Sequence, residues 1–118
     1  MEAKEIVKKY IDQGFVKGFA SLLEEENSKR IQAKGLVGSQ DAFVVTAISQ
    51  ITGKCQLIIL HDKEEAGYFL NDLQSLNPEQ EIQFLPYSYK KPYEFDEVEN
   101  ANVLLRTEVL NKIKGNSF

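Results

Sequence analysis

The sequence predicts an α/β fold, in which helices flank a parallel sheet. Three short, mainly apolar segments carry this prediction as candidate strands, at residues 30–37, 56–60 and 82–85. The stretches between them, at residues 39–51 and 62–76, have the apolar spacing of amphipathic helices. Because candidate strands and helices alternate, right-handed crossovers would place the strands side by side in one parallel sheet.

Two further helices are expected before the first strand, at residues 2–13 and 16–26, with Gly14 as the end of the first. We therefore predict an N-terminal helical segment over residues 1–29 and a partial α/β domain over residues 30–118. Three strands make a small sheet, so we expect the chain to be a fragment of a longer protein.

The segment at residues 56–60 is an unbroken run, Gln-Leu-Ile-Ile-Leu. A strand that is apolar on both faces is typical of a parallel sheet covered by helices on both sides. The neighbouring Cys55 is predicted to be buried as a small apolar residue. It is the only cysteine, which excludes an internal disulfide and fits a reducing, cytoplasmic compartment.

Local signals predict several helix ends. Asp62 is a candidate N-cap, with Glu65 three residues later to complete a capping box. Gly53 is placed to end the preceding helix. A last helix is expected at residues 96–114, with Arg106 on its surface.

Composition excludes some functions. The formal net charge of −4 disfavours a general nucleic-acid binder, which is normally basic. No apolar run approaches the roughly 20 residues of a membrane-spanning helix. His61 is the only histidine, and we predict neither a catalytic residue nor a metal site.

A glycine-bearing turn at residues 35–43 lies between the first candidate strand and its helix, where a P-loop would lie. A working P-loop needs a lysine for the outer phosphates and a hydroxyl for magnesium. Asp41 and Ala42 stand at those positions, and a carboxylate repels polyphosphate. We therefore predict a vestigial P-loop that binds no cofactor, with key positions Gly35, Gly38, Ser39 and Asp41. A residual anion site at the helix N-terminus and a purely structural turn both remain possible here.

A family resemblance rests on residues 60–73, Leu-His-Asp-Lys-Glu-Glu-Ala-Gly-Tyr-Phe-Leu-Asn-Asp-Leu, and on the tyrosine-rich residues 87–94. Both resemble segments that follow the P-loop in UvrB-type DNA repair proteins. Without P-loop chemistry, the chain is most similar to the N-terminal UvrB-like module of the bacterial transcription-repair coupling factors (Mfd). The resemblance covers roughly residues 30–114.

This resemblance implies a partial P-loop NTPase fold of the RecA type, like UvrB domain 1. It also implies a cytoplasmic, non-catalytic scaffold or interaction domain that packs on other domains of its parent protein and holds an autoinhibited state. The parent would be an ATP-dependent DNA translocase that releases stalled RNA polymerase and recruits nucleotide excision repair. ATP and magnesium would bind its motor domains, and UvrA and RNA polymerase would contact regions outside this chain.

The tyrosine-rich segment offers a candidate partner or DNA contact, formed by Tyr87, Tyr89, Lys90, Lys91 and Tyr93. Tyrosines and lysines together can stack on bases and contact phosphates. Acidic residues follow directly and would repel DNA, so protein contact or simple packing is favoured over DNA contact.

Two other functions are compatible with the same residues. One is a nucleotide-binding enzyme domain of the P-loop type with an unusual loop. The other is a stand-alone α/β module that binds a small ligand at the carboxyl ends of its strands.

Overall fold

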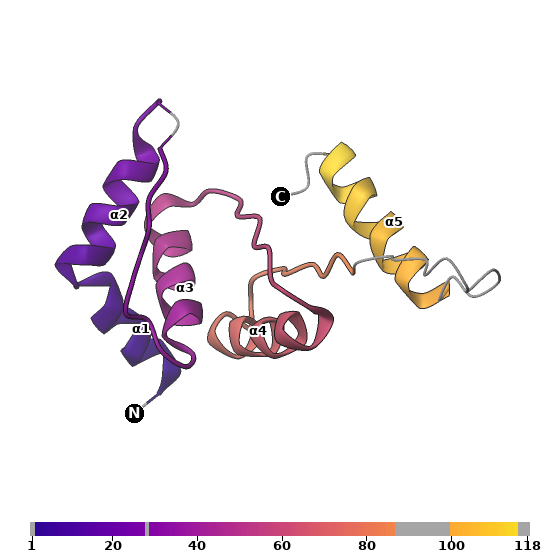
Figure 1. Cartoon of the computed structure of the whole chain (residues 1–118), viewed down its shortest axis with the longest axis horizontal. Coiled ribbons are helices and arrows are strands. Elements are labelled where there is room, and N and C mark those ends of the chain that lie inside the picture. Colours follow the sequence, from indigo (N-terminus) through magenta and orange to yellow (C-terminus); the bar gives the residue numbers. More distant parts are fainter. Residues whose placement is uncertain (1, 28, 87–99, 116–118) are drawn as a thin grey trace.

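The structure, a computed structural model, describes residues 2–27, 29–86 and 100–115 (Figure 1). Its regular elements within those ranges are all α-helices: α1 (Ala3–Ile11), α2 (Gly14–Glu24), α3 (Gln40–Thr52), α4 (Lys63–Leu76) and α5 (Asn100–Lys114). Each lies where the sequence predicts a helix, with ends shifted by a few residues. The predicted start of the last helix, at residues 96–99, lies outside the described residues.

Helix α3 is the centre of the fold, because α1, α2 and α4 all pack against it (Figure 1). Its buried residues lie on more than one side of the helix, as expected for a helix that is covered by several neighbours. One core cluster consists of Val7, Ala42, Leu73 and Leu76. The other consists of Val16, Val44, Ala47 and Ile48.

A polar contact joins α3 to the end of α4. Thr46 is buried, and its Oγ1 accepts a hydrogen bond from Asn77 Nδ2 at 3.0 Å. Asn77 is the C-cap residue of α4. The hydroxyl therefore keeps a partner inside the core, and the end of α4 is held against the middle of α3.

The prediction of an α/β fold with a parallel sheet is wrong. The described residues contain five helices and no strand, so they do not form the partial P-loop NTPase fold of RecA/UvrB type. The three candidate strands, residues 30–37, 56–60 and 82–85, are non-helical connections between helices. A backbone ladder between them is absent from the described residues.

The reason is that a strand needs a partner. An apolar, β-branched run favours extended backbone, but a strand forms only when a second segment satisfies its N–H and C=O groups. Residues 30–37 instead lie along the helices, where Leu36 packs against the cluster that contains Val44. The run alone does not specify a partner that is distant in the sequence.

Two burial predictions fail in the same region. Leu57 and Ile59 are 81% and 85% exposed, so helices do not cover both faces of residues 56–60. Cys55 is exposed rather than buried. Exposure alternates along the segment, with Leu57 and Ile59 outward and Gln56 and Leu60 less exposed. This alternation is the one expected of extended backbone.

Helix ends follow the local signals with one exception. Gly53 ends α3 in the left-handed conformation, at φ 63°, and its N–H donates to Ser49 O at 2.9 Å, as predicted. Gly14, in contrast, is the first residue of α2, and the break from α1 falls at Asp12 and Gln13. The expectation that Gly14 ends the first helix is therefore wrong.

Helix α5 packs against none of the other four helices and lies to one side of them (Figure 1). It is held instead by the connection at residues 81–86. Arg106 Nη1 donates a hydrogen bond to Pro86 O at 2.8 Å, and Lys112 forms an ion pair with Glu81. Val109 is buried, at 6% exposure, among the residues of this helix whose side chains are described.

Candidate functional site

The turn before α3 is built on two glycines with positive φ. Gly35 has φ 84° and Gly38 has φ 59°, in the region that residues with a Cβ rarely adopt. Val37 N donates to Gln40 Oε1 at 3.0 Å, and Gln40 N donates back to Val37 O at 3.3 Å. This reciprocal pair closes a tight turn and leads the chain into α3.

The N-terminus of α3 carries its own carboxylate. Asp41 Oδ1 accepts a hydrogen bond from Ala42 N at 2.8 Å, while the N-cap Ser39 makes no side-chain cap. A negative charge at a helix N-terminus interacts favourably with the helix dipole. The same charge repels an incoming phosphate and takes one of the N–H groups that would bind it. Between the two alternatives for this turn, the geometry favours the structural one.

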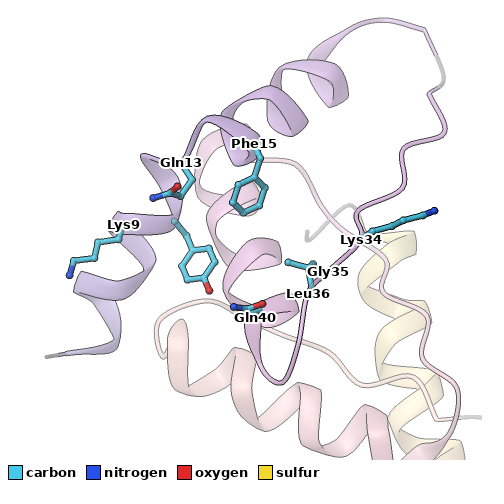
Figure 2. Close-up of a pocket in the computed structure, with 8 residues that line it drawn as sticks. Lys9, Gln13, Phe15, Lys34, Gly35, Leu36 and Gln40 are labelled. Carbon is cyan, nitrogen blue, oxygen red and sulfur yellow. The ribbon is translucent and has the colours of Figure 1, made fainter.

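An open groove of about 460 Å³ lies between α1, the start of α2 and the turn before α3 (Figure 2). Its lining residues are Lys9, Tyr10, Gln13, Phe15, Lys34, Gly35, Leu36 and Gln40. The side chains of Lys9 and Lys34 point in opposite directions, away from Phe15 and Gln40, so the two cations do not converge (Figure 2). The groove thus presents aromatic, aliphatic and amide surface. Tyr10 is fixed by stacking on Phe43, with ring centroids 5.3 Å apart.

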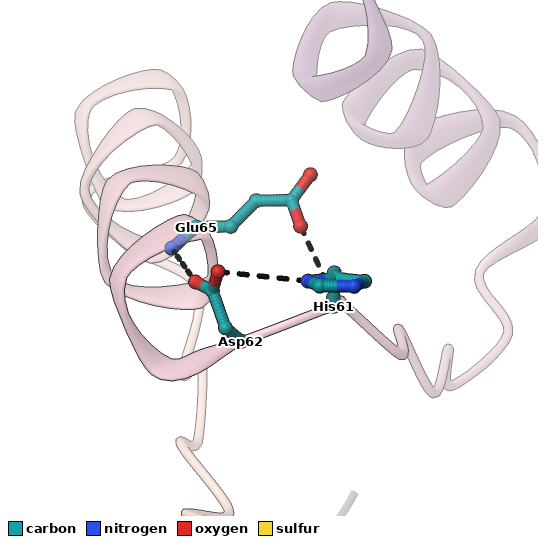
Figure 3. A network of polar contacts seen from close by, with 3 residues as sticks. All are labelled: His61, Asp62 and Glu65. Carbon is teal, nitrogen blue, oxygen red and sulfur yellow. Dashed lines mark hydrogen bonds and ion pairs between the residues drawn. The ribbon is translucent and has the colours of Figure 1, made fainter.

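The predicted cap of α4 is confirmed (Figure 3). Asp62 Oδ1 accepts a hydrogen bond from Glu65 N at 2.8 Å. Glu65 reaches back as expected, but its Oε2 accepts from His61 N, at 3.1 Å, rather than from Asp62 N. His61 Nδ1 lies 3.6 Å from Asp62 Oδ2. The hydrogen bond from Glu65 N lowers the pKa of the Asp62 carboxyl, with a smaller contribution from His61.

This cap predicts a pH-dependent stability. Because the pKa of Asp62 is lowered in the folded protein, its carboxylate stabilises the fold above the unfolded value of about 3.9, and this contribution is lost as the pH falls through the folded value. Asp62→Ala should lower the melting temperature at pH 7. Asp62→Asn keeps a capping oxygen without the titrating charge. The difference between wild type and Asp62→Asn should therefore shrink on acidification, in thermal melts from pH 7 to pH 3. An unchanged difference would contradict the assignment.

The contact between Arg106 and Pro86 is one that the sequence did not predict. Arg106 was expected on the surface, whereas the guanidinium is partly buried and donates to Pro86 O. The available signal was its position three residues before the buried Val109, on the same side of α5. An arginine at that spacing can lay its stem along apolar surface and place its head on a carbonyl.

Exposed apolar side chains include two groups of neighbouring residues. On α5 they are Val103, Leu104, Leu105, Leu110 and Ile113. In the connection between α3 and α4 they are the side chains of residues 57–59. Beside the latter, Gln56 Nε2 is buried and finds no hydrogen-bond acceptor in the part of the chain that the structure describes.

The remaining predicted positions are placed as follows. Gly35, Gly38, Ser39 and Asp41 come together in the turn before α3. The candidate contact residues Tyr87, Tyr89, Lys90, Lys91 and Tyr93 lie outside the described residues. Within the described ranges, His, Cys, Asp and Glu side chains do not gather in a group that could hold a metal ion. The helices described are too short or too polar to cross a membrane.

Comparison of the chain with models of known protein families, with curated proteins and with solved structures gives no match.

Proposed function

We propose that this chain is a non-catalytic interaction and scaffold domain that docks another domain of a larger protein through α5. The observation that carries the proposal is the apolar surface of α5. Its aliphatic residues point to nearly all sides of the helix, yet Val109 is the buried one among those whose side chains are described. Large aliphatic side chains that stay exposed on one helix are favourable for a partner to cover.

The exposed part of α5 has the chemistry of a protein contact. Leu104 is 71% exposed, and Leu110 and Ile113 are each more than half exposed. Aliphatic side chains gathered on one helix are favourable to bury against a second apolar surface. The anchors Arg106 and Lys112 lie on the side of residues 81–86, which leaves the leucines available to a partner.

The larger protein is proposed from the sequence resemblance alone to be a transcription-repair coupling factor. The supporting residues are 60–73 and the tyrosine-rich segment after them. In that setting the chain would be cytoplasmic and would contact the parent protein's other domains. ATP, magnesium, UvrA and RNA polymerase would bind elsewhere in the parent, and we expect no DNA contact by this chain.

The test adds this chain in trans to a transcription-repair coupling factor that lacks its own N-terminal module. We expect binding by isothermal titration calorimetry and a reduced ATPase rate of the truncated factor. The double variant Leu104→Glu and Leu110→Glu places two charges in the proposed contact and should weaken binding at least about tenfold.

The matched control is Gln74→Glu, which adds a negative charge at an exposed position of α4. It should bind like wild type, and circular dichroism should show that all variants keep their helices. Equal affinity for the double variant and wild type would contradict a docking role for α5. Failure of wild type to bind would contradict the assignment to this family of factors.

A further inference from the structure

The connection between α3 and α4 contains a segment with an unpaired backbone. Among the described residues, the N–H and C=O groups of residues 55–60 take part in no hydrogen bond. Leu57 and Ile59 point outward, and the alternating exposure fits extended backbone. An exposed, apolar, extended segment of this kind is a template for strand addition.

We propose that residues 56–60 pair with the same segment of a second copy of this chain, as an antiparallel two-stranded ribbon centred on Ile58. In this register Leu57 of each copy lies opposite Ile59 of the other, so two aliphatic pairs form on the exposed face. Aliphatic cross-strand pairs are a main source of stabilisation between strands. This proposal rests on residues 56–60 and is independent of the α5 surface.

Charge selects this arrangement over others. Lys54 lies four positions before Ile58, and Asp62 lies four positions after it. In the proposed register, each Lys54 therefore lies opposite Asp62 of the other copy. The parallel in-register alternative would set lysine against lysine and aspartate against aspartate. Exposed ion pairs contribute little affinity, but like charges directly opposite each other are unfavourable. The two pairs therefore fix register and direction, while the aliphatic residues supply the affinity.

The same register places Cys55 opposite His61 of the second copy, which gives a direct test. Residues 55 and 61 of one extended chain are separated by roughly 20 Å, too far for a disulfide within the chain. The variant His61→Cys should therefore form an intermolecular link between positions 55 and 61 under mild oxidation, identified by peptide mass spectrometry. Glu64→Cys, whose new thiol lies outside the register, is the control and should cross-link at least about tenfold less.

Sedimentation equilibrium of the reduced wild-type chain, at about 10 to 500 µM to cover a weak interface, should show a monomer–dimer equilibrium. Lys54→Glu should weaken it about tenfold, and Lys54→Gln, which loses the same hydrogen bond to Leu23 O, should weaken it less. Three outcomes would overturn the proposal: a monomer throughout this range, a dominant link between the two Cys55 residues, or open-ended assemblies in place of a dimer.

Discussion

Replacing Ile48 with alanine is expected to lower the free energy of unfolding by about 3 kcal/mol. Ile48 is 4% exposed and lies on α3 in the cluster with Val16, Val44 and Ala47. The substitution removes three carbon atoms from a site bounded by three helices, and helices that meet on all sides cannot collapse fully into the cavity. Urea denaturation monitored by circular dichroism measures the change.

Ile59→Ala is the matched control, because it makes the same chemical change at a position that is 85% exposed. Its cost should stay within about 0.5 kcal/mol when the chain is measured as a monomer. The pair of variants thus also tests the correction from a covered strand to an exposed connection. If Ile59→Ala were as costly as Ile48→Ala, residues 56–60 would be core.

Arg106→Ala is expected to release α5 from residues 81–86 without unfolding the other helices. The variant loses a hydrogen bond from a charged donor to Pro86 O, a type worth about 1.5–3 kcal/mol. A helix of 15 residues is marginal in water by itself. Amide hydrogen exchange in α5 should therefore become about tenfold faster or more, while exchange in α3 stays unchanged.

Lys114→Ala provides the control, since it removes a cation at an exposed position of the same helix. It should leave exchange in α5 close to that of wild type. A uniform increase in exchange over α1–α4 in Arg106→Ala would show that α5 is part of the central core. No increase anywhere would show that the contact with Pro86 O does not hold the helix.

Much of the helical structure could be predicted because its signals are local. The spacing of apolar residues, the cap at Asp62 and the stop at Gly53 each involve residues within a few positions of one another. The hydrogen bonds that these residues form in the structure also join positions only a few residues apart in the sequence. Local pattern and local structure therefore agree.

Whether a sheet forms could not be predicted in the same way, because strand pairing depends on segments that are distant in the sequence. Residues 56–60 have side chains that favour strands, but their own sequence does not specify which distant segment would pair with them. The contact of Arg106 with Pro86 likewise spans twenty residues. At the turn before α3, the presence of a carboxylate at Asp41 was visible from the sequence, whereas the hydrogen bond that it accepts from Ala42 N was not.

The central position of α3 has a consequence for how the chain acquires its structure. All three partners of α3 are distant in the sequence: α1 and α2 end 29 and 16 positions before α3 begins, and α4 begins 11 positions after α3 ends. Each of these pairings must close a loop before its buried contacts form, and the cost of closing a loop rises only slowly with its length. Because α3 shares its buried surface with all three partners, we expect α1–α4 to unfold together in one cooperative transition.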